Sequence, residues 1–223
     1  MDVYREAGEA TFAEHDAALL GFKPQQLGSL ALSLQPLTGN GIAVYSLLAG
    51  LTINQLQSAF PKGDAHIRVM PNLAARIGKS PIILLQEGLS QRACESAFAL
   101  FDKLGTALWL EEEAKFDLVT ALAGSGPGFV YRFIDALAEA GRGLGLAEQQ
   151  ATSLALSMVE GASMLAANSD VSPGTLADRV ASPGGMTREG LNVLDANKAL
   201  VDLLTETLKA TAKRGSELSA GAK

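Results

Sequence analysis

Gly41-Ile42-Ala43-Val44-Tyr45-Ser46-Leu47-Leu48 decides the fold class, together with the two segments that follow it in the chain. The stretch is a short, largely apolar run, which is typical of a buried strand. Residues 52–60 then have a helical pattern that opens on a Thr N-cap, and His66-Ile67-Arg68-Val69-Met70 is a second apolar run. Strand, helix and strand in this order indicate a parallel sheet in a doubly wound α/β domain.

The same alternation extends to both sides of this unit. Residues 17–22 are expected to form a strand and residues 25–35 a helix, while two further strands, 81–86 and 106–110, bracket a helix over 91–104. We therefore expect an α/β domain that spans residues 1–112.

The pattern changes at Glu111-Glu112-Glu113, which is interpreted as a solvated linker or helix start rather than a catalytic carboxylate set. Beyond it, apolar residues recur at helical spacing and no strand pattern survives. Long helices over 129–146 and 148–167 have faces rich in Ala and Gly, which favour close helix packing, either between subunits or within one chain. Residues 113–223 are therefore expected to form an all-helical domain.

Composition excludes several classes of function. The net charge of -6, without a Lys/Arg cluster, argues against nucleic-acid binding. The two histidines lie far apart without acidic or Cys companions, so no metal site is predicted. The N-terminus lacks the features of a secretory signal, and Pro and Gly interrupt the uncharged segment 24–61 too often for a membrane helix. The single cysteine, Cys94, is expected in the core and fits a reducing compartment. These features predict a cytoplasmic protein that binds neither nucleic acid nor membrane.

Ala181-Ser182-Pro183-Gly184-Gly185-Met186-Thr187 is the candidate functional loop. The two glycines let the main chain approach a ligand, and the helix expected after Thr187 puts free N–H groups at its positive end. The loop is therefore suited to bind a carboxylate or a phosphate. An ordinary turn with Thr187 as N-cap explains the pattern as well.

A dinucleotide-binding glycine fingerprint is not found. Gly124-Ser125-Gly126-Pro127-Gly128 and Gly143-Leu144-Gly145 do not follow a strand, and nothing ahead of Ala17 has the required form. We therefore expect that the sequence begins partway into its own sheet.

Four stretches carry a resemblance to a known family. Residues 173–195, with Ser182-Pro183-Gly184-Gly185-Met186-Thr187 at their centre, resemble the signature segment of pyrroline-5-carboxylate reductase, the last enzyme of proline biosynthesis. Three shorter segments agree in order and spacing: Gly21-Phe22-Lys23-Pro24-Gln25, Arg68-Val69-Met70-Pro71-Asn72 and Leu122-Ala123-Gly124-Ser125-Gly126-Pro127. The resemblance extends from about His15 to Leu218. It implies a Rossmann-like domain followed by a helical dimerisation domain, and thus at least a homodimer.

The resemblance also implies an activity and a substrate site. Family members reduce a cyclic imine that carries a carboxylate to L-proline, with hydride from NADPH or, in some members, NADH. By resemblance, Ser182, Gly184, Gly185 and Thr187 bind the substrate carboxylate through N–H and hydroxyl groups. A Thr hydroxyl is a poor acid, so Thr187 is expected to orient a protonated imine or to relay a proton from water.

Cofactor residues are assigned by the same resemblance. Lys23, Pro24, Leu48 and Ala49 are expected beside the nicotinamide ribose and diphosphate. Met70, Pro71 and Asn72 are expected to flank the nicotinamide. A solvated Lys23 and an Asn72 that caps a turn explain these two residues equally well.

This sequence departs from the family pattern in places. Leu73-Ala74 stands where Thr-Pro is usual, and Gly21-Phe22 stands where Ala-Val is usual. By analogy, about fifty residues with the first strand and the glycine-rich turn precede Met1 in the family, so weak binding of NADPH is expected. The alternatives are a noncatalytic remnant that serves oligomerisation or binds a carboxylate, and a related imine or β-hydroxyacid reductase.

Overall fold

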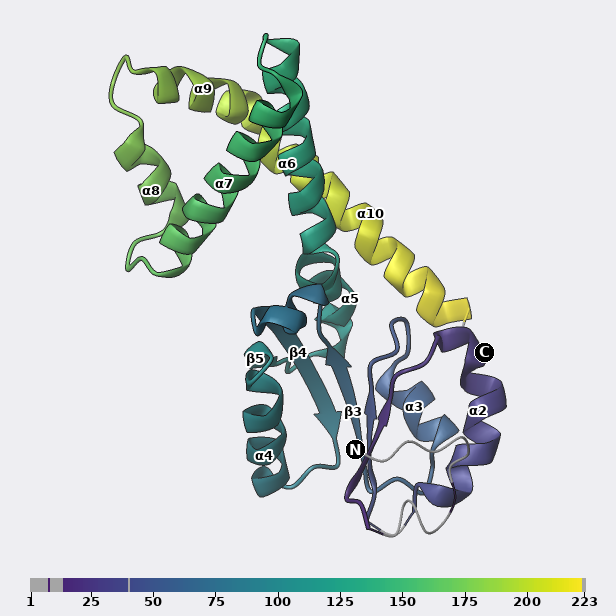
Figure 1. The fold of residues 1–223 in the computed structure, drawn as a ribbon. Coiled ribbons are helices and arrows are strands. Elements are labelled where there is room, and N and C mark those ends of the chain that lie inside the picture. The colour runs from purple at the N-terminus through teal and green to yellow at the C-terminus, as the bar shows by residue number, and fades with distance from the viewer. Residues whose placement is uncertain (1–7, 9–13, 40, 222–223) are drawn as a thin grey trace. The chain divides into compact units, whose positions relative to one another are not determined.

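The structure is a computed structural model that describes residue 8 and residues 14–39 and 41–221. Contacts divide the chain into two compact units, one formed by residues up to Ser125 together with those from Leu208 onward, the other by Gly126–Thr207. Figure 1 shows the elements of both. The expected domain boundary at 112/113 falls inside the first unit, shortly before α5 (Phe116–Val119).

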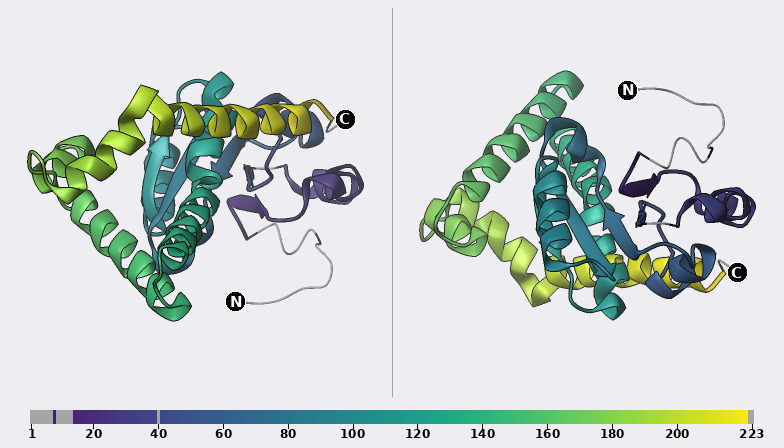
Figure 2. Two further views of the ribbon diagram at one scale, coloured as in Figure 1. Left: turned by 90° about the horizontal axis from the view of Figure 1, so that it is seen from above. Right: turned by 90° about the horizontal axis from the view of Figure 1, so that it is seen from below.

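The first unit is built on a five-stranded sheet in the order β1-β2-β3-β4-β5. Its strands are β1 (Ala17–Leu20), β2 (Ala43–Ser46), β3 (Ala65–Met70), β4 (Ser80–Glu87) and β5 (Gly105–Trp109). All five lie within one residue of the predicted positions or inside them. In the two views of Figure 2, β1, coloured purple, lies at the edge of the sheet. The predicted Rossmann-like fold class is confirmed.

One strand pair departs from the predicted parallel sheet. β1, β2 and β3 pair in parallel, and so do β4 and β5, but β3 and β4 are antiparallel, with His66 opposite Glu87 and Met70 opposite Ile83. The connection between β3 and β4 covers only residues 71–79 and contains the short 3-10 helix η3 (Leu73–Ile77). A parallel crossover needs a dozen or more residues, so this connection can only reverse the chain.

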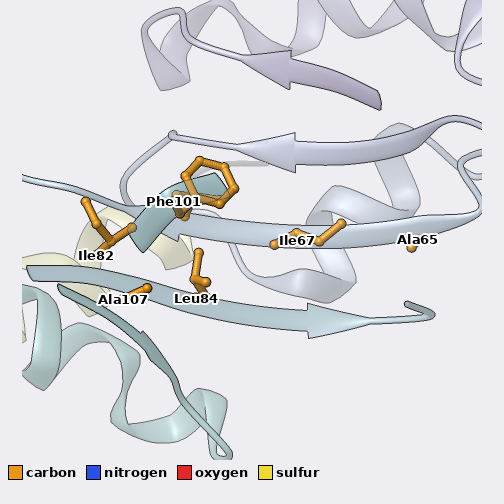
Figure 3. Close-up of a cluster of buried hydrophobic side chains, with 7 residues drawn as sticks. Ala65, Ile67, Ile82, Leu84, Phe101 and Ala107 are labelled. Atoms are coloured by element: carbon orange, nitrogen blue, oxygen red, sulfur yellow. The ribbon is translucent and has the colours of Figure 1, made fainter. Parts of the chain in front are cut away.

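Helices cover both faces of the sheet. α2 (Leu27–Leu34) and α3 (Ile53–Ala59) pack on β1 and β2, with Val44, Leu56 and Phe60 fully buried. α4 (Gln91–Asp102) packs on one face of β3, β4 and β5, where Phe101 joins the cluster of Figure 3. On the opposite face, α5 brings Phe116 against Met70, Ile83 and Leu85. Every residue of β3 is buried, as expected of a central strand covered on both faces.

Local sequence signals explain where these helices begin. Thr52 caps α3 in a capping box: its Oγ1 accepts from the Gln55 N–H (3.2 Å), and the Gln55 Oε1 accepts from the Thr52 N–H (2.9 Å). Ser90 Oγ accepts from the Ala93 N–H at the start of α4 (3.3 Å). The Thr N-cap predicted for residues 52–60 is confirmed.

Cys94 was expected in the core, but the structure does not place it there. It is partly exposed on α4 and lines a hollow of about 700 Å³ with Phe98 and Trp109. Helical periodicity predicts which side chains of α4 lie near its buried face, but it does not predict how closely the neighbouring strand covers each of them. The histidines behave as ordinary residues, because His15 is exposed and the buried His66 has Nε2 2.8 Å from the Phe60 carbonyl oxygen.

The second unit is helical. It contains α6 (Gly126–Gly143), α7 (Glu148–Ala167), α8 (Pro173–Val180), α9 (Met186–Asp195) and the first residues of α10 (Ala199–Gly221), and α6 packs against α7. α6 was expected over 129–146. It begins earlier, because Pro127 is tolerated in a first helical turn, and it ends earlier, because Gly145 has φ +108°.

Few side chains are buried in the second unit. Among its described residues, the buried apolar side chains are those of Ala151, Ala155 and Ala181. Larger apolar side chains on α6 and α7 remain exposed, among them Phe133, Leu154 and Leu165. A unit of this kind lacks the apolar core that stabilises a helical domain by itself.

Candidate active site

The loop Ala181–Gly185 connects α8 to α9. The Gly185 N–H donates to the Ser182 carbonyl oxygen (2.9 Å), which closes a turn, and Gly184 has φ +70°, a conformation that favours glycine. A Cβ atom on Gly185 would lie 2.6 Å from Ser182 Oγ and 3.1 Å from its carbonyl oxygen. The backbone path therefore requires glycine at position 184, while a side chain at position 185 would crowd Ser182.

Gly185, not Thr187, is the N-cap of α9, and it has no side chain to cap the helix. The ordinary interpretation of this loop, a turn with Thr187 as N-cap, is therefore wrong about the cap. Thr187 lies in the first turn, with its side chain exposed. The N–H groups of residues 186–188 have no acceptor inside the helix, because the first turn of an α-helix leaves them free.

An ion pair holds the two ends of this loop together. Arg188 Nη2 lies 2.8 Å from Asp178 Oδ1 on α8 and donates to the carbonyl oxygen of the buried Ala181 (3.4 Å). These two charged residues were not singled out in the sequence, although they are ten positions apart in the signature segment. This ion pair links α8 to the first turn of α9.

The predicted cofactor residues lie in the first unit, where β1, β2 and β3 end. Lys23 and Pro24 follow β1, Leu48 and Ala49 follow β2, and Met70 is the last residue of β3. Since these three strands are parallel, their carboxyl ends meet at one edge of the sheet, where ligands bind in open α/β folds. The structure thus brings the predicted cofactor residues to a common edge. Lys23 and Ala49 are exposed there, and Leu48 is buried.

Asn72 has a structural role at this edge. Its Oδ1 accepts from the Ala74 N–H (2.8 Å) and its Nδ2 donates to the Ala123 carbonyl oxygen (2.8 Å). Its own N–H donates to Oγ of the buried Ser80 (2.9 Å). Asn72 caps η3, in agreement with the alternative interpretation of this residue, and joins the end of β3 to the π-helical segment η5 (Thr120–Gly124).

A cavity of about 490 Å³ adjoins Ala49 and Met70. Its other walls come from Arg68, from α5 and η5, and from residues of α10 that belong to the same unit. Gly50 permits the close approach of α10: it has φ +74°, and a Cβ atom there would lie 3.1 Å from Leu218 Cβ. The Gln55 side chain also donates from Nε2 to the Ser219 carbonyl oxygen (2.9 Å).

Glu113 begins the 3-10 helix η4 (Glu113–Lys115), which confirms the helix start expected at the acidic run, but its carboxylate is paired with Arg68 rather than merely solvated. Its Oε1 accepts from Arg68 Nη1 (2.8 Å) and from the Ile53 N–H (2.7 Å), whereas Glu111 and Glu112 are exposed. The Arg68 side chain is only 4% exposed, and its guanidinium lies 3.5 Å above the Phe116 ring. Burial lowers the pKa of Arg68, and the hydrogen bond with Glu113 opposes this shift. The carboxylate therefore stabilises the buried cation and fixes the start of α3.

The described residues contain neither a metal centre nor a membrane-spanning helix. Between residues 14 and 221, leaving out residue 40, no group of three or more His, Cys, Asp or Glu side chains could hold a metal ion. In that same part of the chain, none of the helices has the length and apolar character needed to span a bilayer.

The chain is similar to known proteins over most of its length. A family model described as pyrroline-5-carboxylate reductase dimerisation matches residues 113–218. The chain is 34% identical to a pyrroline-5-carboxylate reductase of Pseudomonas aeruginosa, over 98% of this chain and 80% of the relative. It is 36% identical to pyrroline-5-carboxylate reductase 2 of Bacillus subtilis, over 93% of this chain and 74% of the relative.

Solved structures agree with these relatives. A pyrroline-5-carboxylate reductase from Coxiella burnetii superposes with a TM-score of 0.87 at 28% identity, covering 95% of this chain and 78% of the other. The Plasmodium falciparum pyrroline carboxylate reductase, solved with NADP bound, superposes with a TM-score of 0.82 at 25% identity and covers 95% and 80%. By sequence and by fold, this chain belongs to the pyrroline-5-carboxylate reductase family.

Proposed function

We propose that this protein reduces 1-pyrroline-5-carboxylate to L-proline, the last step of proline biosynthesis, with hydride from NADPH or NADH. The observation that carries the proposal is the start of α9, where Gly184 and Gly185 shape a turn that leaves the first helical N–H groups without a cap. Membership of the reductase family supports the same activity.

The α9 terminus suits the carboxylate of this substrate. Free N–H groups and the positive end of the helix dipole both favour an anion. Since the Gly185 N–H is already bonded to Ser182, the main-chain donors proposed for the ligand are those of Gly184, Met186, Thr187 and Arg188. Ser182, Gly184 and Gly185 then shape the site, and the Ser182 hydroxyl, which is exposed, adds a further donor.

Thr187 is the proposed catalytic residue. Its exposed hydroxyl is on the first turn of α9, beside the N–H groups that would hold the carboxylate. A hydroxyl of ordinary acidity does not protonate the ring nitrogen, so its role is to accept a hydrogen bond from the protonated imine and orient the ring.

The edge formed by β1, β2 and β3 fits a dinucleotide cofactor. The exposed Lys23 and Ala49, with Pro24 and Leu48, would hold the ribose and diphosphate, and Met70, Pro71 and Asn72 would flank the nicotinamide. The cavity beside Ala49 and Met70 provides space at that end. When bound, the cofactor supplies the hydride. The protein residues hold the cofactor and the substrate and exclude water.

The second unit is proposed to form a homodimer or a larger homo-oligomer. Its buried apolar side chains are alanines within the described part of the chain, while Phe133, Leu154 and Leu165 are exposed. The match to a dimerisation family supports the same conclusion. Sedimentation that shows only monomer at micromolar concentration would contradict the dimer.

We further propose that residues 1–112 bind the cofactor and that residues 113–223 pair with a second copy and bind the substrate. We also propose that the enzyme is cytoplasmic.

The activity is tested with the purified 223-residue chain, by following the absorbance of NADPH as pyrroline-5-carboxylate is added. Turnover supports the proposal, and Thr187→Ala should then lower kcat by about 100-fold with unchanged thermal stability. Thr152→Ala, an exposed threonine of α7, is the matched control and should keep full activity. Absence of turnover, with tight proline binding and a stable dimer, would instead support a noncatalytic carboxylate-binding module.

A further inference from the structure

The loop of the proposed carboxylate site joins two helices that have no buried side chain. It connects α8 to α9 (Figure 1), and every residue of both helices, which the structure describes in full, is at least partly exposed. Ala181, at the start of the loop, is buried. Helices are held in place mainly by packing of an apolar face. Within one copy of the chain, such packing therefore does little to fix the direction in which α9 leaves the loop.

The side chain of Arg188 makes two contacts across this connection. Its Nη2 donates to Asp178 Oδ1 in the last turn of α8 at 2.8 Å and to the Ala181 carbonyl oxygen at 3.4 Å. The Arg188 side chain is 30% exposed and that of Asp178 is 72% exposed. One guanidinium thus joins the first turn of α9 to the end of α8 and to the first residue of the loop.

Arg188 occupies an unfavourable position for a cation in a helix. It lies in the first turn of α9, three residues after the N-cap Gly185, where the helix dipole favours acidic side chains. Its contact with Asp178 compensates for this cost. Arg188 therefore contributes to the connection between the two helices rather than to the stability of α9 by itself.

We propose that the Arg188 side chain is a positioning residue for substrate binding: paired with Asp178, it holds the start of α9 so that the free N–H groups face the substrate carboxylate. The inference rests on the proposed function, which assigns these N–H groups to the carboxylate. Without the pair, Gly184 and Gly185 leave the loop many conformations. Binding would then have to order the loop, and this cost lowers affinity.

The test is the affinity of the full chain for L-proline, which carries the same carboxylate as the substrate, measured by calorimetry and thus independently of turnover. Arg188→Met and Asp178→Asn should each weaken proline binding about fivefold, the effect of one lost polar contact. The two substitutions change the local charge in opposite directions, so simple attraction of the carboxylate predicts opposite effects. Loss of positioning predicts the same effect for both.

A double variant and the reaction kinetics test the pair further. Arg188→Met combined with Asp178→Asn should bind proline no more weakly than either single variant, because both remove the same contact. Each variant should raise KM for 1-pyrroline-5-carboxylate with kcat unchanged, since the N–H groups hold the carboxylate equally before and during hydride transfer. Arg188→Lys keeps a cation opposite Asp178 and should restore most of the affinity.

Arg132→Met is the matched control. Arg132 also forms an exposed ion pair in the second unit, with Asp135 of α6 at 2.8 Å, and this variant should bind proline as the wild type does. If Arg188→Met does not fold, Asp178→Asn tests the same contact from its largely exposed side.

The possible contrary results have different meanings. Tighter proline binding by Asp178→Asn overturns the inference, because the released guanidinium would then contact the carboxylate directly. Wild-type affinity in both single variants also overturns it, and leaves the proposed function standing. Wild-type protein that neither binds proline nor reduces 1-pyrroline-5-carboxylate contradicts the proposed function and the inference with it.

Discussion

Replacing Glu113 by alanine should be among the most destabilising changes at the surface of the first unit. The substitution leaves the guanidinium of Arg68, which is 4% exposed, without its carboxylate. Breaking a buried pair from one side costs about 3–5 kcal/mol. Since the Glu113 side chain is 34% exposed, water can partly replace it, and the lower end of that range applies. The lost bond to the Ile53 N–H adds about 1 kcal/mol.

The expected loss is therefore about 4 kcal/mol, which corresponds to a fall in Tm of about 8–16 °C for a chain of this size. Circular dichroism during heating measures it, and the urea midpoint at unchanged slope checks it. Glu113→Gln keeps the acceptor oxygen and should lose less than half as much. Glu112→Ala is the matched control, because its ion pair with Lys115 is exposed and should change stability by less than about 0.5 kcal/mol.

The reasoning is refuted if Glu113→Ala unfolds within 1 °C of Glu112→Ala. Such a result would mean that Arg68 finds another partner or that water reaches it in the folded state. Loss of stability in both variants by the same large amount would also contradict it, since the control has no buried partner.

Three further predictions concern the first unit. Gly105→Ala should prevent stable folding, because φ is +150° and the added Cβ would overlap the Ser80 backbone. Gly28→Ala is the control: the space around its added Cβ is open, so this variant should fold normally when both are compared by thermal melting. Burial raises the pKa of Tyr45, so the neutral phenol stabilises the fold below pH 10.0, and this contribution is lost as pH rises through the folded pKa. In Tyr45→Phe the decline of stability above pH 10.0 should therefore be shallower than in the wild type. A steeper decline would refute this. Thr52→Ala should cost about 1 kcal/mol in urea unfolding through loss of its cap on α3, and an unchanged midpoint would show that the cap is dispensable.

Much of the fold could be predicted from local pattern. The strands and helices follow from apolar runs, caps and glycines, which depend on neighbours in the chain. The antiparallel β3–β4 pair could not be predicted in this way, because an apolar run does not specify the direction of its partner. The length of the connection 71–79 carried the missing signal.

The candidate site could be predicted where it depends on backbone shape. Gly184 and Gly185 suggested a glycine turn that leads into α9 and leaves its first N–H groups free, and the structure has this turn. The acidic run was correctly interpreted as a possible helix start, but the partner of Glu113 could not be predicted, because only folding brings Arg68, far away in sequence, against one of the three glutamates. Thr120 lies just ahead of the segment 122–127 that carries the resemblance, and its unpaired hydroxyl emerges only from the packing around it.

The reversed strand pair at the centre of the sheet also bears on how the protein folds. β3 and β4 are joined through residues 71–79, whereas the other neighbouring strands are joined by longer connections that each contain an α-helix. Closing the shortest loop costs the least chain entropy, so the β3–β4 hairpin is the strand pair that forms most readily. We expect the sheet to grow outward from this hairpin, so that the edge strand β1 is added last.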